Sequence, residues 1–459
     1  MSIERRIFGT DGVRGTANIE PVTAETALRL GRASAHVFKN LSGNRSKERH
    51  KIVIGKDTRL SGYMLENALS SGILSMGVDV LFIGPLPTPG VAYVTRSLRA
   101  DAGIAITASH NPYDDNGIKF FRSDGYKLDD PVEAQIEELV FSGAIESIRP
   151  TAGAIGKAVR IDDALGRYIE FAKASFPRGM TLEGMRIVVD CANGAAYKST
   201  PCVLRELGAE VFVFGNQPDG TNINKECGSM HPESMCRKVY EVRADLGIAH
   251  DGDADRVLLS DETGALIDGD DVMAIVGLDL LASGSLRQNT LVATVMSNAG
   301  LDVALGAVGG RVLRTQVGDR YVIEEMLRNG YNFGGEQSGH LIFGDHGTTG
   351  DGLVAALQVL RAMKAKRKPL SELRQCWKRF PQLVINLRVR EKKPLEELDG
   401  VLGLVGQADS ELKPQGGRAF LRYSGTEPKI RLLLEGPEVA ALKTWSERIG
   451  DSIRRQIGA

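Results

Sequence analysis

The sequence predicts an α/β protein in which three related mixed-sheet α/β domains and a C-terminal α+β domain surround a central cleft. A strand–helix–strand–loop order occurs three times, and each copy ends in a polar loop at an equivalent place. From Pro381 onward the order of strands and helices differs. The 459 residues also exceed what one hydrophobic core usually organises, since domains typically hold about 100–200 residues. The expected domains are 1–157, 158–262, 263–370 and 371–459.

Composition narrows the class of protein. The 57 Lys and Arg residues nearly balance 58 Asp and Glu residues, so bulk charge argues against nucleic-acid or membrane-surface binding. No uncharged apolar run reaches the ~18 residues of a membrane span, and the N-terminal residues lack the apolar core of a signal peptide. The 5 cysteines form no CxxC pair, which is typical of reduced thiols. We therefore expect a cytoplasmic monomer or homodimer with neither a nucleic-acid nor a membrane partner.

The first domain begins with a glycine-punctuated loop that carries Arg14. A helix is expected from about Thr23 to Lys39, where apolar residues recur at helical spacing. The first copy of the repeat follows. It is expected to hold a strand at 51–55, a helix at 63–76 and a second strand at 78–83.

A serine loop closes the first copy. Thr107-Ala-Ser-His-Asn-Pro112 lies between an apolar strand at 102–106 and a second strand at 118–121. The hydroxyl of Ser109, beside His110 and Lys119, could act as a nucleophile or carry a phosphate. Alternatively, the loop is a turn whose polar side chains only satisfy the backbone.

An acidic loop closes the second copy, whose expected elements are 186–190, 199–207, 209–214, 246–250 and 257–260. Asp251, Asp253 and Asp255 alternate with small residues, and carboxylates this close repel one another unless a cation or protons compensate. Carboxylate oxygens are hard ligands that suit Mg²⁺ or Ca²⁺. Three of them leave coordination positions of the ion open for a phosphate oxygen, which fits Mg²⁺ acting as a Lewis acid. The loop is not an EF-hand, because the sixth position, which is glycine in an EF-hand, is Arg256 here, and the residues that follow are typical of a strand. Arg256 would suit an anionic substrate, and a solvated acidic turn remains the alternative.

A glycine-rich loop closes the third copy, whose expected elements are 290–296, 301–306, 311–317 and 341–343. Glu336 and Ser338 could bind hydroxyl or amine groups of a sugar. His340 could move a proton near neutral pH, although a lone histidine is often structural. Arg320 adds a charged turn in the same domain.

The C-terminal domain is expected to hold strands at 384–389 and 418–423 and helices at 395–403 and 438–455. The loop between its strands is typical of an anion cradle, because glycine admits backbone N–H groups, hydroxyls donate and arginines grip phosphate. The candidate residues are Arg422, Ser424, Gly425, Thr426 and Arg431. The alternative is an ordinary turn with two exposed arginines. No G-x-x-x-x-G-K-[ST] motif occurs, which argues against a P-loop NTPase.

Four of these motifs together, in this order, resemble the α-D-phosphohexomutase superfamily. They are Thr107–Pro112, Asp251–Arg256, Gly335–His340 and Arg422–Arg431. Residues 8–15 and the Gly-Glu-Gln-Ser-Gly-His loop are most similar to the members that act on glucosamine phosphates. The resemblance implies a four-domain, heart-shaped fold with a central cleft. It also implies interconversion of glucosamine 6-phosphate and glucosamine 1-phosphate through a 1,6-bisphosphate, feeding UDP-N-acetylglucosamine and cell-wall synthesis.

The same resemblance implies a role for each motif. Ser109 would be the phosphorylated serine and, through its phosphate, a further ligand of one Mg²⁺ per chain held by the three aspartates. Glu336 and Ser338 would read the sugar, and the cradle would hold the substrate's own phosphate. Proton transfer or charge stabilisation would fall to Lys119, His340, Arg14, Arg256 and Arg320. The remaining alternatives are a mutase for glucose or mannose phosphates, a metal-dependent sugar phosphatase and a non-catalytic sugar-phosphate binder.

Overall fold

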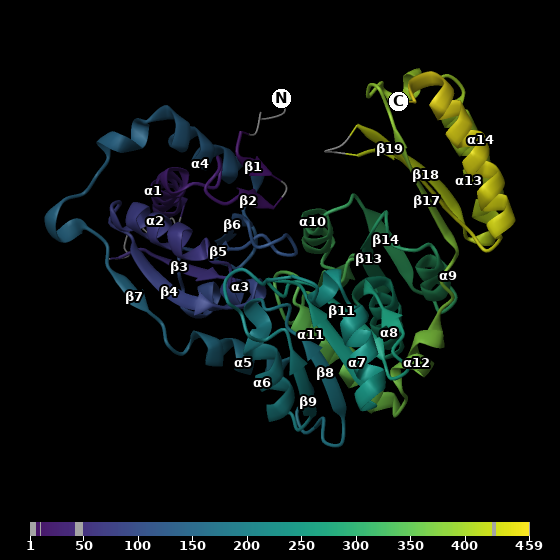
Figure 1. Cartoon of the computed structure of the whole chain (residues 1–459), viewed down its shortest axis with the longest axis horizontal. Helices are drawn as coiled ribbons and strands as arrows, with labels where there is room; N and C mark the ends of the chain where they lie inside the picture. Colours follow the sequence, from purple (N-terminus) through teal and green to yellow (C-terminus); the bar gives the residue numbers. More distant parts are fainter. Residues whose placement is uncertain (1–5, 10, 42–48, 425–427, 459) are drawn as a thin grey trace.

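The computed structural model describes residues 6–9, 11–41, 49–424 and 428–458. Within these residues the strands form four sheets, of 7, 5, 4 and 3 strands. The sheets follow one another along an arc, with the N-terminal unit at one end and the C-terminal unit at the other (Figure 1). No helix in the described part of the chain is both long and apolar enough to cross a membrane.

The first three sheets share one topology. In each, a central strand pairs in parallel with the second and third strands, and the third pairs antiparallel with the fourth. The strands are β3 (Lys51–Lys56), β4 (Asp79–Pro85), β5 (Ala102–Ile106) and β6 (Asp115–Arg122); β8 (Arg186–Asp190), β9 (Glu210–Phe214), β10 (Leu246–His250) and β11 (Val257–Asp261); and β13 (Thr290–Thr294), β14 (Arg311–Thr315), β15 (Phe333–Gly335) and β16 (Leu341–Phe343). The predicted fold class with its threefold repeat is confirmed.

Short strands extend the first two sheets. They are β1 (Phe8–Gly9), β2 (Gly12–Thr16), β7 (Ala158–Arg160) and β12 (Leu266–Ile267). Two of them lie close to the expected domain boundaries. β7 pairs with β4, so residues 158–160 lie with the first sheet, just beyond the expected boundary at 157. β12 forms a hairpin with β11. Strands of two or three residues are too short to show an alternating pattern in sequence.

The helices cover the sheets. They are α1 (Ala24–Leu41), α2 (Gly62–Leu74), α3 (Thr88–Ser97), α4 (Asp130–Ser142), α5 (Ala164–Ala174), α6 (Ser199–Glu206), α7 (Glu233–Val242), α8 (Gly269–Ala282), α9 (Gly300–Gly306), α10 (Asp319–Asn329), α11 (Gly352–Lys366), α12 (Leu370–Leu373), α13 (Val401–Leu412) and α14 (Val439–Ile457). The sequence did not predict α3, α4, α5, α7, α8, α10 or α12. From Gly352 to Met363 every residue of α11 except Arg361 is buried, so this helix lacks the polar face that reveals an amphipathic helix.

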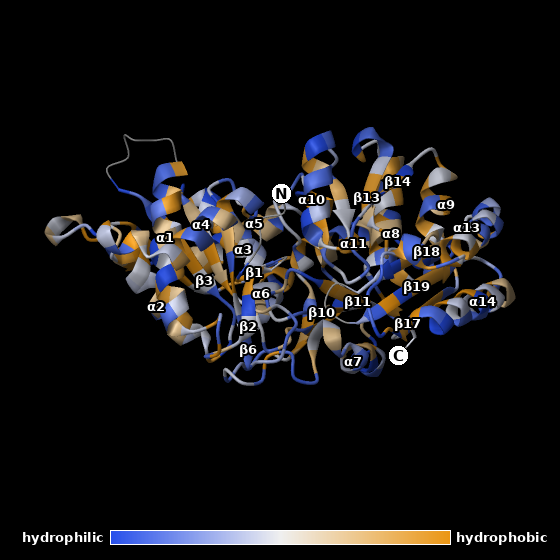
Figure 2. Ribbon diagram, turned by 90° about the horizontal axis from the view of Figure 1, so that it is seen from above, coloured by the Kyte–Doolittle hydropathy of each residue, from blue (hydrophilic) through white to orange (hydrophobic). Residues whose placement is uncertain are grey.

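One continuous hydrophobic core joins the first three units. It includes Val53 of β3, Val189 of β8 and Leu291 of β13. Hydrophobic residues concentrate on the strands and on the inner faces of helices (Figure 2). At the centre, buried Tyr168 of α5 donates a hydrogen bond to Asp351 at the start of α11 (3.0 Å). The three units therefore hold their loops in a fixed relation to one another.

The fourth unit has a hydrophobic core of its own. Its sheet has the order β17 (Gln382–Arg388), β19 (Lys429–Glu435), β18 (Arg418–Tyr423), all antiparallel. Two sequence predictions are wrong here. The helix expected at 395–403 is a short 3₁₀ turn at Leu395–Glu397 followed by α13, because Gly400 adopts a left-handed conformation (φ +67°) between them. Arg422 and Arg431, which we expected in a loop, are direct partners on the neighbouring strands β18 and β19.

Candidate active site

The three polar loops of the repeated units occupy the same position, between the third and fourth strands of each sheet. They meet at a cavity of about 770 Å³. Its walls combine residues of the first unit with residues of the second and third. Those predicted from sequence are Arg14, Ser109, Asp255, Arg256, Arg320, Glu336 and His340. The central cleft is thus present, and it is built from segments more than two hundred residues apart in the chain.

Ser109 lies at the tip of the β5–β6 loop, where it is 2% exposed and has a positive φ of 52°. Its hydroxyl donates a hydrogen bond to Asp251 Oδ2 at 2.5 Å. Its backbone N–H donates to the hydroxyl of Thr107 at 2.9 Å. The acidic loop approaches closely, since a Cβ on Gly252 would lie 2.6 Å from the carbonyl oxygen of Ser109. The serine hydroxyl is therefore held directly against the acidic loop.

Two side chains that the sequence did not reveal hold the serine loop. Arg59 Nη2 and Asn224 Nδ2 both donate to the carbonyl oxygens of Ser109 and Asn111, at 2.9–3.0 Å. Arg59 is 1% exposed and is paired with Asp57 at 2.8 Å. Arg59 belongs to the first unit and Asn224 to the second, so two units fix the loop. The sequence shows that Arg59 follows an Asp-Thr pair at the end of a strand. Its contacts with the serine loop form only in the folded protein, so the sequence did not reveal them.

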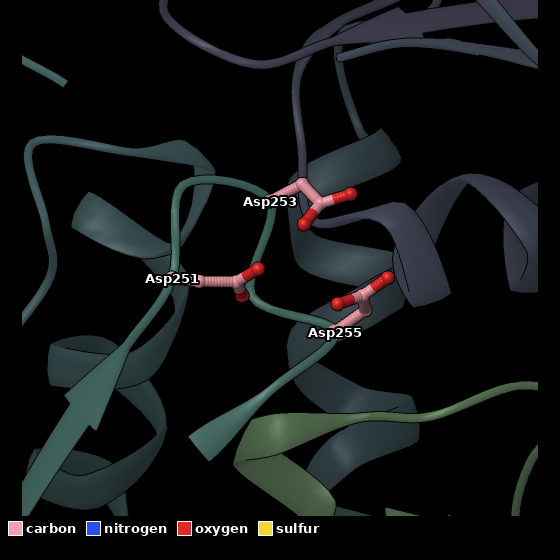
Figure 3. A group of neighbouring side chains, drawn as sticks. All are labelled: Asp251, Asp253 and Asp255. Carbon is pink, nitrogen blue, oxygen red and sulfur yellow. The ribbon is translucent and has the colours of Figure 1, made fainter. Parts of the chain in front are cut away.

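Asp251, Asp253 and Asp255 project into one space (Figure 3). One carboxylate oxygen from each lies within 4.8 Å of the others, and all three residues are buried. Burial and the two neighbouring carboxylates raise the pKa of Asp251 well above its usual range. Asp253 Oδ1 is buried and accepts no hydrogen bond from the described residues. A buried carboxylate oxygen without a donor, in a cluster of like charge, fits a divalent cation with hard oxygen ligands.

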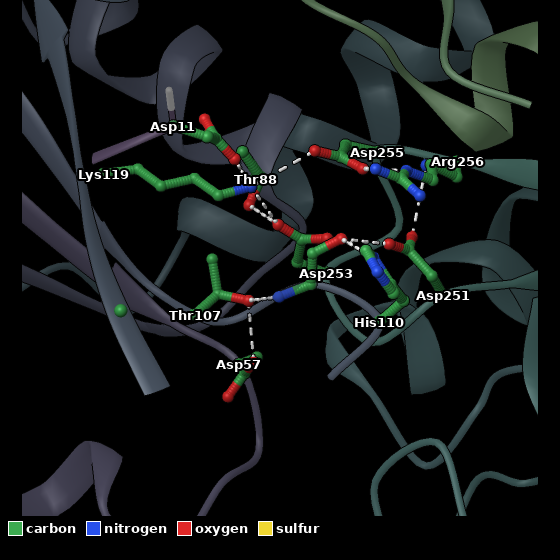
Figure 4. A network of polar contacts seen from close by, with 12 residues as sticks. Asp11, Asp57, Thr88, Thr107, His110, Lys119, Asp251, Asp253, Asp255 and Arg256 are labelled. Atoms are coloured by element: carbon green, nitrogen blue, oxygen red, sulfur yellow. Dashed lines mark hydrogen bonds and ion pairs between the residues drawn. The ribbon is translucent and has the colours of Figure 1, made fainter. Parts of the chain in front are cut away.

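Lys119 sits among three carboxylates (Figure 4). Its ammonium lies 2.9 Å from Asp253, 3.3 Å from Asp255 and 3.0 Å from Asp11. Burial would lower the pKa of Lys119, but these carboxylates outweigh it and hold the pKa well above the usual range. Thr88 at the start of α3 also binds the acidic loop, donating to Asp253 Oδ2 at 2.7 Å. Lys119 is therefore a cation fixed beside the oxygens of the acidic loop.

The glycine-rich loop supplies the opposite wall. Burial raises the pKa of the Glu336 carboxyl, which accepts a hydrogen bond from Gly318 N at 2.9 Å. His340 is buried 3.6 Å from Asp255 and 3.3 Å from Asp319. Burial would lower the pKa of His340, but the two carboxylates raise it. Ser338 is exposed, and it is absent from the described residues that line the cavity.

Three arginines border the cavity in different settings. Arg256 lies beside Asp255 (4.0 Å), and its backbone N–H donates to Asp251 at 3.2 Å. Arg14 pairs with Asp11 at 3.2 Å. Arg320 is engaged with acidic residues of α4 and α10. Its partners are Asp130, Glu133 (3.8 Å) and Glu324 (3.3 Å). Arg256 and Arg14 therefore lie next to the acidic groups at the cavity, whereas Arg320 forms part of its rim.

His110 follows Ser109 and lies 3.4 Å from the serine hydroxyl. Burial and the cations Arg256 and Arg14 lower the pKa of His110 to about 4. This imidazole is therefore neutral at pH 7.

The predicted anion cradle lies at a second, smaller cavity of about 210 Å³. Arg422 and Arg431 line it together with Met296 of the third unit. Ser424 is buried at the end of β18, and Gly425 and Thr426 lie outside the described residues. The structure thus separates the arginines of the fourth unit from the cavity at Ser109.

Models of the four domains of phosphoglucomutase/phosphomannomutase match this chain. The α/β/α domains I, II and III match residues 5–146, 167–264 and 268–380, and the C-terminal domain matches residues 384–452. The phosphoglucosamine mutases of Geotalea daltonii and Geobacter metallireducens are 57% and 58% identical to it over 454 residues, covering 99% of each chain.

Solved structures show the same fold at lower identity. A phosphoglucomutase/phosphomannomutase family protein from Burkholderia thailandensis superposes with a TM-score of 0.80 at 23% identity, covering 99% of both chains. The N-acetylphosphoglucosamine mutase of Aspergillus fumigatus, in complex with GlcNAc-6P and magnesium, gives 0.66 at 16% identity, covering 99% of this chain and 96% of that one. A serine-to-alanine variant of the same fungal enzyme, in complex with glucose 1,6-bisphosphate, gives 0.65 at 18% identity with the same coverage.

Proposed function

Because the chain belongs to the phosphoglucomutase/phosphomannomutase family, we propose that it interconverts glucosamine 6-phosphate and glucosamine 1-phosphate. The relatives with this activity in their names are 57–58% identical along the whole chain. The observation that carries the proposal is the buried Ser109 hydroxyl, 2.5 Å from the acidic cluster on the wall of a sugar-sized cavity. The product would feed UDP-N-acetylglucosamine synthesis in the cytoplasm.

Ser109 is the proposed phosphoryl carrier. The phosphoserine would donate its phosphoryl group to the free hydroxyl of the bound sugar phosphate. The bond from Ser109 Oγ to phosphorus breaks, a bond from the sugar oxygen to phosphorus forms, and the hydroxyl proton passes to a basic group of the cavity. The product of this half-reaction is glucosamine 1,6-bisphosphate, which turns around and returns its other phosphoryl group to Ser109. Phosphoryl transfer of this kind depends mainly on positioning and charge neutralisation.

Asp251, Asp253 and Asp255 are the proposed ligands of one Mg²⁺ per chain. Such an ion, when bound, withdraws electron density from phosphoryl oxygens and neutralises their charge. The fungal relative in complex with magnesium and the buried oxygen of Asp253 support this proposal. Lys119 and Arg256 add positive charge beside Asp253 and Asp255, Arg14 adds a further cation on the cavity wall, and His340 is suited to hold or move a proton.

Sugar and phosphate recognition fall to the other two loops. Glu336 would accept hydrogen bonds from the sugar and pair with the ammonium of glucosamine, and Ser338 and Arg320 would contact the same ring from the rim. Arg422, Ser424, Gly425, Thr426 and Arg431 would hold the phosphate that is not being transferred. This requires the fourth unit to move toward the larger cavity, and its separate hydrophobic core is compatible with such a movement.

The experiment that tests the function compares initial rates on glucosamine, glucose and mannose 6-phosphates while inorganic phosphate is measured. We expect the highest kcat/KM with glucosamine 6-phosphate and no stoichiometric release of phosphate. Thorough chelation should remove the activity and Mg²⁺ should restore it. A preference for glucose or mannose phosphate would contradict the proposed substrate, and phosphate released in step with substrate consumption would indicate a phosphatase.

A further inference from the structure

Six titratable side chains, alternately basic and acidic, form a closed ring of contacts beside the larger cavity. The successive distances are Lys119–Asp11 3.0 Å, Asp11–Lys127 2.6 Å, Lys127–Asp319 2.5 Å, Asp319–His340 3.3 Å, His340–Asp255 3.6 Å and Asp255–Lys119 3.3 Å. Three members come from the first unit, one from the second and two from the third. None of the six side chains is more than 25% exposed. The ring therefore joins the three units where the proposed chemistry takes place.

Lys127 differs from the other members of the ring. It is absent from the described residues that line the 770 Å³ cavity, and its side chain is 14% exposed. Its ion-pair partners are Asp11 and Asp319, one on each side, and neither is a proposed metal ligand. Lys127 thus lies behind the wall of the site, where it can act on bound substrate only through its neighbours.

The segment that carries Lys127 is docked firmly on the third unit. Thr348 donates a hydrogen bond to the carbonyl oxygen of Gly125 at 2.8 Å, and Arg320 donates to that of Leu128 at 3.2 Å. Tyr126 packs against the hydrophobic cluster that includes Met326 and Tyr331. Because both ends of this turn are fixed, the ammonium of Lys127 has a defined place between two carboxylates.

We propose that Lys127 is a positioning residue of the mutase, which bridges Asp11 and Asp319 and thereby fixes Lys119 and His340 against the transferring phosphoryl group. This inference rests on the proposed function. Without the ammonium, two mostly buried carboxylates would face each other with no cation between them. They would separate or take up a proton, and either change alters the ion pair of Asp11 with Lys119 and the contact of Asp319 with His340. The site would keep its residues but lose their alignment, to which phosphoryl transfer is sensitive.

The test is a comparison of Lys127→Met with Lys173→Met in the full-length protein. Lys173 is a matched control, because it also bridges two carboxylates, those of Glu170 and Glu206, both at 2.6 Å, but lies outside the site. For Lys127→Met we expect kcat for glucosamine 6-phosphate to fall by at least about tenfold, with KM changed by less than about threefold. Lys173→Met should keep both constants. Lys127→Arg, which retains a cation able to bridge, should recover part of kcat.

A kcat for Lys127→Met within about twofold of the wild type would overturn the proposal, as would an equal loss in both methionine variants. If Lys127→Met does not fold, Asp319→Asn breaks the ring at the next contact. The proposal then requires the same selective loss of kcat in Asp319→Asn, and normal kcat there overturns it. The proposed function is judged separately, since it fails if the wild-type protein itself does not convert glucosamine 6-phosphate.

Discussion

At the scale of single residues, the position of Ser109 depends on carbonyl oxygens held from two sides. Its positive φ costs about 1–3 kcal/mol and persists only because the surroundings enforce it. Arg59 and Asn224 provide that enforcement through the carbonyl groups of Ser109 and Asn111. Arg59 and Asp57 also form a buried salt bridge. Burial raises the pKa of Asp57, and the adjacent Arg59 opposes this rise.

Replacing Arg59 with Met should destabilise the protein and remove most of its activity. The change removes the guanidinium that donates to four backbone carbonyl oxygens. It also leaves Asp57 buried without its cation, which costs about 3–5 kcal/mol. Arg59→Lys should recover the charge but not the planar fork of donors. The measurements are Tm and kcat, with Arg454→Met at an exposed position of α14 as a control that leaves both unchanged. A Tm for Arg59→Met equal to the wild type would contradict this account of the serine loop.

The sequence revealed the reacting groups better than the groups that hold them. Ser109 and the three aspartates stand out because each lies in a short polar loop between two apolar strands. Asn224 and Lys127 carry no such signal, since their partners lie on segments that meet only in the folded molecule. Asp11 lies in a glycine loop that was predicted to matter, but only Arg14 was singled out there.

At the scale of elements, the start of α8 supports the glycine-rich loop. Asp268 caps the helix by accepting hydrogen bonds from the N–H groups of Asp270 and Asp271, and Arg379 binds its carboxylate. Gly269 N donates to the carbonyl oxygen of Gln337 at 3.1 Å, and a Cβ on Gly269 would lie 2.1 Å from the carbonyl oxygen of Glu336. The helix end therefore fixes the backbone of the proposed sugar-binding residues.

Asp268→Ala should lower the free energy of unfolding by about 1–2 kcal/mol through the lost cap. It should also raise KM for glucosamine 6-phosphate more than it lowers kcat, because the loop at Glu336 loses its support. Asp268→Asn keeps an acceptor and should retain most of the stability. The measurements are urea denaturation and steady-state kinetics, with Glu438→Ala as the control. Glu438 is the N-cap residue of α14, and its side chain caps no N–H group of the described helix. Equal stability of Asp268→Ala and the wild type would refute the role of the cap.

Apolar strands were predicted well, but several helices were not, including the amphipathic α7 and α10. β5, β10 and β13 are apolar runs bounded by polar loops and were found close to their observed ends. α8 was missed because it is buried on nearly all sides and shows no helical periodicity. The strand β19 was not predicted, because its first residues, as far as Arg431, were assigned to the loop of the phosphate-cradle motif.

At the scale of the whole molecule, the first three units share one hydrophobic core, and the fourth unit contacts the third, where Glu435 accepts a hydrogen bond from Ala299 N at 3.2 Å. Asn298 holds the backbone of Phe380, with its amide donating to the carbonyl oxygen and accepting from the N–H, both at 3.0 Å. Beyond this point the fourth unit carries its arginines at a cavity separate from Ser109. Sequence patterns predicted the number and order of units, but the relation between these two cavities depends on the fold. In the proposed mechanism, a bisphosphate exchanges its two ends between these positions, which requires the cavities to join during turnover.

The most direct test of the central claim, that Ser109 carries the phosphoryl group, is the mass of the intact protein after incubation with glucosamine 1,6-bisphosphate and Mg²⁺. The wild type should gain the mass of one phosphoryl group, located on Ser109 by peptide mapping, and should lose it when glucosamine 6-phosphate is added. Ser109→Ala should gain no mass and should not convert glucosamine 6-phosphate, while keeping the Tm of the folded protein. Turnover by Ser109→Ala at the wild-type rate, or a phosphoryl group on another residue, would contradict the account.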